Sequence, residues 1–333
     1  MNTNEKISEI NKLKKELDVT IVAHFYQKDE VFELGDITGD SLELAKKALN
    51  SKNKNIVFCG VGFMGESVKV LSPEKNVYMP KIACCAMARM IDVEYYKENL
   101  KILNDLGIAN EDLLPVTYIN SSAAVKAEVG KMGGYVCTSS NAFAIIETAL
   151  KSGKKIFFVP DRCLGQNFAD QMGLKSAVVG VDTDEKVKEA DIICYNGFCS
   201  VHQLFTVEDI EFYKNKYPDI IIAVHPECDR AVVQKADFVG STSQLIKYIT
   251  ELPENQKVAV GTEYNMVNRL REKNTYVLSS TKPECPTMNE TTVEDLYNTL
   301  VAIKEGNCAT EIKVDEEVVK WAKVALERMF EVK

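Results

Sequence analysis

Short apolar runs rich in β-branched residues recur along the whole chain and alternate with longer segments of helical periodicity. The runs cover residues 19–24, 55–60, 76–80, 115–120, 134–140, 155–160, 190–197, 220–228, 236–242, 257–263 and 275–280. Runs this short and continuous are typical of strands buried on both faces of a parallel sheet. Between them, segments such as DSLELAKKALN and SNAFAIIETALKSG have the spacing of amphipathic helices. The alternation predicts an α/β protein.

Polar residues at the predicted strand ends recur in a threefold order. A strand ends in each third at His24, Asn120 and His225. A hydroxyl residue then follows at a predicted helix start, and these residues are Ser41, Ser139 and Thr242. A cysteine comes later in each third, at Cys85, Cys199 and Cys285. This order predicts three copies of one β–α–β–α–β unit.

The repeat sets the expected domain organisation. We expect units at residues 1–95, 96–205 and 206–305, each with one of the three cysteines, and a helical segment at 306–333. Ligands of open parallel sheets bind beyond the carboxyl ends of the strands. We therefore expect the three polar strand ends to meet at one central site. Three independent domains with unrelated strand ends are the alternative.

The helix starts and strand ends offer groups for an anionic substrate and for proton transfer. A hydroxyl residue at a helix start caps the helix, and that alone explains its presence. Three in register also favour binding of phosphate or carboxylate groups at the helix N-termini. His225 and Glu227 lie two residues apart, so an imidazole and a carboxylate are close enough to move protons near neutral pH. Tyr26 and Tyr118 stand near the other two strand ends.

Ten cysteines are spread over the 333 residues, and most are expected to be small buried side chains. Three thiolates that meet at one site would suit zinc or an iron–sulfur cluster. No CxxC pair occurs, which argues against ferredoxin-type and zinc-ribbon sites. Three ligands would leave one iron of a [4Fe–4S] cluster open as a Lewis acid, which suits dehydration.

The composition limits the classes of binding partner and the cellular compartment that we expect for this protein. The formal net charge of −9 argues against nucleic acid and against a membrane surface, since both favour basic patches. No run of 18 apolar residues and no signal-like N-terminus is present. The first twenty residues are instead typical of a short charged amphipathic helix. We expect a cytoplasmic protein in a reducing compartment, without disulfides.

Nine motifs in this order resemble those of the quinolinate synthase (quinolinate synthetase A) family of NAD biosynthesis. They are AHFYQ, GDSLELA, FCGVGFMGES, TYINSSAAVKAE, CTSSNA, HPEC, GSTSQLI, GTEYNM and CPTM, and they extend from about residue 20 to about 305. The resemblance implies three similar αβα domains with short parallel sheets around a pseudo-threefold axis. It also implies a central [4Fe–4S] cluster held by Cys85, Cys199 and Cys285.

The resemblance further implies a reaction. Iminoaspartate and dihydroxyacetone phosphate would condense to quinolinate with loss of phosphate and two waters, and an L-aspartate oxidase or aspartate dehydrogenase would supply the iminoaspartate. The implied catalytic residues are His24, Tyr26, Tyr118, His225 and Glu227. The implied substrate contacts are His24, Ser41, Tyr118, Asn120, Ser139, His225, Glu227 and Thr242.

The sequence departs from the family pattern beside the first ligand. Cys84 stands where the family usually has glycine, and Arg89 stands where an aspartate is usual. Neither change removes a ligand, and we assign Cys84 no role. Two other classes remain open from spacing alone: a zinc hydrolase that uses the same thiolates, and a non-catalytic phosphosugar-binding protein.

Overall fold

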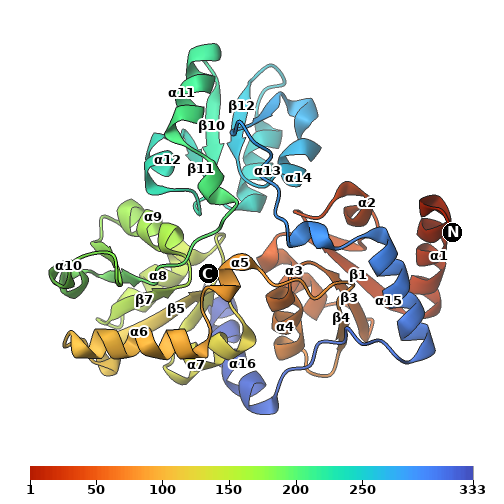
Figure 1. Cartoon of the computed structure of the whole chain (residues 1–333), viewed down its shortest axis with the longest axis horizontal. Helices are drawn as coiled ribbons and strands as arrows, with labels where there is room; N and C mark the ends of the chain where they lie inside the picture. The colour runs from red at the N-terminus through yellow and green to blue at the C-terminus, as the bar shows by residue number, and fades with distance from the viewer. Residues whose placement is uncertain (333) are drawn as a thin grey trace.

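Three all-parallel sheets form three lobes around a common centre in the computed structural model, which describes residues 1–332 (Figure 1). In the first sheet the strands lie in the order β2-β1-β3-β4, and in the third sheet in the order β11-β10-β12-β13. The first sheet comprises β1 (Val19–His24), β2 (Ile37–Gly39), β3 (Asn55–Cys59) and β4 (Asn76–Tyr78). The third comprises β10 (Ile221–Val224), β11 (Phe238–Val239), β12 (Val258–Gly261) and β13 (Thr275–Val277). The predicted α/β fold of three similar αβα units is confirmed.

The second sheet has one strand more than the other two. Its order is β6-β5-β7-β9-β8, from β5 (Leu113–Tyr118), β6 (Tyr135–Cys137), β7 (Lys155–Val159), β8 (Ser176–Val178) and β9 (Ile192–Cys194). The added edge strand β8 and the helix α10 (Asp184–Glu189) lie between the helix start and the cysteine. They explain why Ser139 and Cys199 are 60 residues apart, whereas Ser41 and Cys85 are 44 apart.

Helices cover both faces of the sheets, as the apolar strands require. The first third contains α1 (Thr3–Glu16), α2 (Asp29–Phe32), α3 (Ser41–Leu49), α4 (Gly62–Leu71) and α5 (Ala86–Arg89). The second contains α6 (Val93–Asp105), α7 (Ala123–Lys131), α8 (Ala142–Leu150), α9 (Arg162–Met172) and α10. The last contains α11 (Val207–Lys216), α12 (Arg230–Lys235), α13 (Thr242–Glu251), α14 (Tyr264–Arg269), α15 (Val293–Glu305) and α16 (Glu316–Glu331). Short 3₁₀ turns lie at Asn110–Asp112, His202–Leu204, Arg271–Lys273 and Met288–Glu290.

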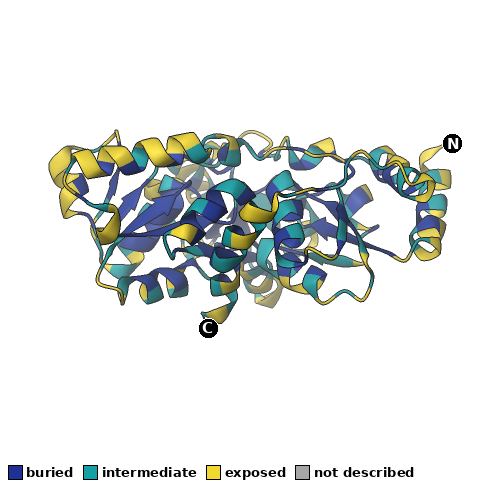
Figure 2. Ribbon diagram, turned by 90° about the horizontal axis from the view of Figure 1, so that it is seen from below, coloured by how far each residue is buried: buried dark blue, intermediate teal, exposed yellow. Residues whose placement is uncertain are grey.

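Burial follows the layers. The six residues of β1 and the six of β5 are all buried, and Figure 2 shows buried strands inside with exposed residues on the outer helix surfaces. The helix predicted for the first twenty residues is confirmed as α1, which begins with a capping box formed by Asn2 and Glu5. No helix within residues 1–332 is long and apolar enough to cross a membrane.

The last two helices pack on the earlier units. One hydrophobic core contains Phe58 of the first sheet, Val116 of the second and Leu326 of α16, so the first two units and α16 share it. Helix α15 lies beside α1, where Leu296 packs in a smaller core with Ile10 (Figure 1). The third sheet has its own two cores. The unit boundaries near residues 95, 205 and 305 stay a prediction.

A glycine permits the close crossing of α7 and α16. A Cβ atom added at Gly130 would lie 2.0 Å from the backbone oxygen of Trp321, which no side chain rotation relieves. We expect Gly130→Ala to lower the free energy of unfolding by about 1–3 kcal/mol, the usual cost of overpacking. Chemical denaturation measures this change. Gly62→Ala is the control, because its nearest neighbour atom would be 3.5 Å away; equal stabilities of the two variants would contradict the crossing.

Candidate active site

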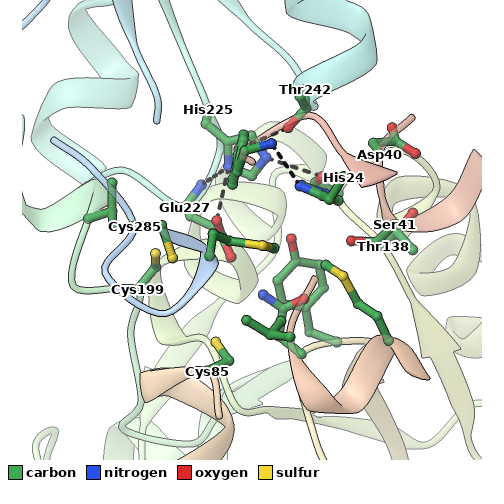
Figure 3. Close-up of a pocket in the computed structure, with 18 of the residues that line it drawn as sticks. His24, Asp40, Ser41, Cys85, Thr138, Cys199, His225, Glu227, Thr242 and Cys285 are labelled. Atoms are coloured by element: carbon green, nitrogen blue, oxygen red, sulfur yellow. Dashed lines mark hydrogen bonds and ion pairs between the residues drawn. The ribbon is translucent and has the colours of Figure 1, made fainter. Parts of the chain in front are cut away.

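One cavity at the centre of the three units is lined by every residue that the sequence singled out for chemistry. These are His24, Tyr26, Ser41, Cys85, Tyr118, Asn120, Ser139, Cys199, His225, Glu227, Thr242 and Cys285. Figure 3 shows the cysteines on one side, His24 and Ser41 on the other, and Glu227 between them. The alternative of three unrelated strand ends is therefore excluded. The roles of these residues stay predictions.

Strand ends and helix starts bring the side chains there. His24 and Tyr118 are the last residues of β1 and β5, and His225 directly follows β10. Ser41 and Thr242 are the first residues of α3 and α13. Because the strands of each sheet are parallel, their carboxyl ends share one edge, and the three edges face the centre.

Two local expectations were wrong in detail. Ser139 does not open a helix: α8 begins three residues later, and Ser139 lies in a turn in which Asn141 Oδ1 accepts from Thr138 N at 2.8 Å. Asn120 does not end a strand: β5 stops at Tyr118, and Ser121 N donates to Ile119 O at 2.8 Å. Both residues still reach the cavity, since the turns lie at the same edge of the second sheet.

Glu227 is a buried carboxylate between two imidazoles. Its Oε2 lies 2.9 Å from Nδ1 of His202 and 3.3 Å from Nδ1 of His225. The two imidazole rings stack with centroids 4.6 Å apart. Burial alone would raise the pKa of Glu227, but the contact with His202 and a hydrogen bond from Tyr118 outweigh it and hold the pKa below its usual value. Glu227 is therefore ionised and placed to accept a proton.

His202 is the residue that the sequence left without a role. It lies three residues after Cys199, is 1% exposed, and its Nε2 lies 3.1 Å from Thr262 Oγ1. The motif CSVHQLF placed it near a proposed ligand, but nothing in the sequence connected it with Glu227. Only the turn that brings the second unit against the third makes that contact.

The two histidines at strand ends are neutral. Burial and the neighbouring His202 lower the pKa of His225 to about 3, and burial lowers that of His24 to about 4. Nδ1 of His24 accepts from Tyr26 N at 3.1 Å, which leaves the proton on Nε2. Nε2 of His225 lies 3.2 Å from Ser139 Oγ. Each histidine thus presents one N–H to its surroundings.

The two tyrosines are protonated donors. Burial raises the pKa of Tyr26 and of Tyr118 well above the ordinary value, and Glu227 adds to both shifts. The hydroxyl of Tyr26 lies 2.9 Å from Thr242 Oγ1 and 3.0 Å from Thr262 Oγ1. A hydroxyl of the first unit is thereby fixed against the third.

Asp40 joins all three units at the edge of the cavity. Its Oδ1 caps α3 by accepting from Leu42 N and Glu43 N, each at 3.0 Å. Its Oδ2 accepts from Ser140 of the second unit at 3.0 Å and from Ser243 of the third at 2.6 Å. Sequence reasoning predicted none of these three residues, because each is explained locally as part of a helix start.

The cysteines of the cavity form a donor set for a metal. Burial raises the pKa of Cys85 to about 12, and Cys285 adds to this shift. Burial also raises the pKa of Cys199 well above its usual value, and Glu227 and Cys85 add to that shift. Thiols held protonated in this way become ligands when a cation replaces the protons. Cys199 also lies with His202 and Glu227 in a group whose ligand atoms are within 4.8 Å of one another. This cavity can therefore hold a metal.

The adjacent cysteine has a different environment. Cys84 is exposed and does not line the cavity, whereas Cys85 is half-buried and does. Cys85 Sγ faces the cavity from the turn before α5 (Figure 3). All ten cysteines are free thiols in the structure.

The neutral state of His24 predicts a pH effect on stability. The unfolded chain protonates this histidine below pH 6.5, whereas the folded protein resists until about pH 4. Stability contributed by neutral His24 is therefore full above pH 6.5 and is lost as the pH falls towards 4, by up to about 3 kcal/mol. Denaturation of His24→Asn, which retains an acceptor for Tyr26 N, should show a pH dependence that is smaller by that amount. An unchanged pH dependence would mean that His24 titrates normally.

Comparison with known proteins assigns the chain. The family model described as quinolinate synthetase A protein matches residues 8–331. A quinolinate synthase of Helicobacter pylori (strain HPAG1) is 57% identical over 332 residues, which is 98% of each chain. The quinolinate synthase of Acidobacterium capsulatum is 41% identical over 94% of this chain and 88% of its own. That of Streptomyces coelicolor is 40% identical over 93% and 84%. The chain therefore belongs to the quinolinate synthetase A family of enzymes.

Proposed function

We propose that this chain is a quinolinate synthase that condenses iminoaspartate with dihydroxyacetone phosphate. Loss of phosphate and two waters balances the atoms of the product, and no oxidant or reductant is consumed. The observation that supports this most directly is the central cavity, where cysteines from all three units meet proton-carrying side chains. An assay for quinolinate with anaerobically purified protein and the two substrates tests the proposal.

Cys85, Cys199 and Cys285 would hold a [4Fe–4S] cluster. The donor set fits, because three half-buried thiols line one cavity and the remaining lining is not thiol. Such a cluster would supply one open iron as a Lewis acid for a substrate hydroxyl or carboxylate. The group formed by Cys199, His202 and Glu227 also suits zinc. Metal analysis decides: stoichiometric zinc without iron would favour the zinc hydrolase.

The residues opposite the cysteines suit two anionic substrates. Ser41 and Thr242 begin α3 and α13, where free N–H groups and the positive end of the helix dipole attract phosphate and carboxylate. Ser139 and Asn120 add polar groups from the turns of the second unit. These groups would bind and orient the substrates, with the phosphate directed to the helix starts.

Proton transfer would fall to the buried side chains around Glu227. Ionised Glu227 would accept a proton from the carbon that becomes nucleophilic, and neutral His225 would pass protons beside it. Protonated Tyr26 and Tyr118 would donate to the oxygen atoms that leave as water, with His24 donating from Nε2. The burial of Glu227, His225 and Tyr118 would protect the imine from hydrolysis.

The chemistry of the substrate suggests how it arrives. Iminoaspartate hydrolyses in water, so a nearby L-aspartate oxidase or aspartate dehydrogenase would supply it. Free thiols throughout the chain agree with a reducing compartment, and we place the enzyme in the cytoplasm.

The adjacent cysteines give a test of the cluster ligands. We expect Cys85→Ser to lose the iron and the visible absorption of the anaerobic protein, because one of three ligands is removed. Cys84→Gly, one position away and exposed, should retain both. The reverse pattern would show that Cys84 is the ligand.

Glu227→Gln tests the proposed base at nearly constant shape. We expect kcat to fall by about 10²–10⁴-fold, the usual contribution of a general base, with unchanged iron content. Full turnover with an intact cluster would show that another group takes the proton.

A further inference from the structure

A buried lysine lies directly behind the turn that carries Asn120. Lys126 is 0% exposed and is the fourth residue of α7, in the first helical turn. Its ammonium group donates to Ile119 O at 2.8 Å and to Ser121 O. The two carbonyl groups belong to the residues on either side of Asn120. The Lys126 side chain therefore binds the backbone carbonyl groups on both sides of Asn120.

The turn itself is tight. Ser121 N donates to Ile119 O, so Asn120 is the central residue of a three-residue γ-turn. Ser121 Oγ donates to Tyr118 O at 3.0 Å and lies 2.9 Å from Thr117 Oγ1. The Oδ1 atom of Asn120 is buried without a protein partner, although the residue lines the cavity. The turn fixes the backbone of Asn120 and leaves its side chain for another partner.

Burying the ammonium group of Lys126 is energetically unfavourable, so its presence here indicates a specific role. Burial lowers the pKa of Lys126 to about 7, and the carboxylate of Glu66 opposes that shift. The positive end of the helix dipole lies beside the ammonium group. Glu66 accepts from Ala123 N at 2.7 Å, and the Phe63 ring lies with its centroid 5.4 Å from Nζ. The first unit thus contributes two side chains that make the buried amine tolerable.

We propose that Lys126 is a positioning residue that fixes Asn120 in the cavity by holding the carbonyl groups on both sides of it. The inference rests on the proposed function, since only there does Asn120 bind substrate. The neutral amine still has two N–H groups, one for each carbonyl, so the arrangement does not require the charge.

A second buried lysine provides a matched control. Lys75 is 7% exposed and donates to Ser51 O at 2.7 Å and to Asn53 O at 3.1 Å, again on both sides of one residue. It belongs to the first unit and does not line the cavity. Lys126→Met and Lys75→Met therefore remove the same kind of contact, and only the first acts near the candidate site.

We expect Lys126→Met to lower kcat/KM by about 10–100-fold with unchanged iron content, because a small displacement of a substrate-binding group has a cost of this order. Lys75→Met should stay within about twofold, since no cavity residue depends on it. When Asn120 is already alanine, adding Lys126→Met should lower kcat/KM by less than about twofold further, because both changes act through the side chain of Asn120. Losses that multiply, or equal losses for both lysines, would overturn the proposal.

Hydrogen exchange tests the positioning without any activity. Exchange should accelerate in peptides that span 117–125 for Lys126→Met and in peptides that span 51–55 for Lys75→Met. If the wild-type protein were inactive and exchange in the turn still accelerated in Lys126→Met, the proposed function would be contradicted and the positioning role would not. Unchanged exchange and unchanged turnover in Lys126→Met, with an active wild type, would contradict the positioning alone.

Discussion

The carboxylate of Glu227 at the centre of the molecule is the charge that its surroundings must accommodate. A buried carboxylate without partners would take up a proton, yet the contact with His202 and a tyrosine hydroxyl keep Glu227 ionised. His202 comes from the second unit, whereas His225 and Glu227 come from the third. The docking of units is thus coupled to the charge state of the site. Burial raises the pKa of both tyrosines, and the same negative charge adds to that shift and keeps them as proton donors.

The sequence was sufficient to predict features that recur in all three units, and insufficient to predict contacts between different units. Parallel strands and the three cysteines follow from a pattern that recurs three times along the chain, so each copy supports the others. The contact between Asp40 and the serines of two other units has no such support, because capping explains Asp40 by itself. His202 was missed for the same reason. Side chains that join different units acquire their roles only from the tertiary structure.

Short strands and turns were the other places where the sequence-based predictions and the structure differ. The three-residue strands β2 and β8 are too brief to show an apolar run, and the turn before α8 replaces the helix start predicted at Ser139. In both cases the local sequence favours more than one conformation, and the neighbouring strand or unit selects among them. The spacing of Ser139 and Cys199 is 16 residues longer than that of Ser41 and Cys85, and this difference indicated additional secondary structure in the second unit.

The distribution of the hydrophobic cores has a consequence for how the protein denatures. The first two units and α16 share one continuous core, so neither of these units can expose its interior without the other. The third sheet has cores of its own, whereas Met288 and α15 pack in the cores of the earlier units. Contacts of the third unit with the first also include the hydroxyl group of Thr242 and the amide of Asn265, which donates to Tyr26 O. We therefore expect a chain built from three similar units to unfold as two cooperative blocks, with the cavity on the boundary between them. Ligands that bridge this boundary would bind the folded form of both blocks and merge their unfolding into one event.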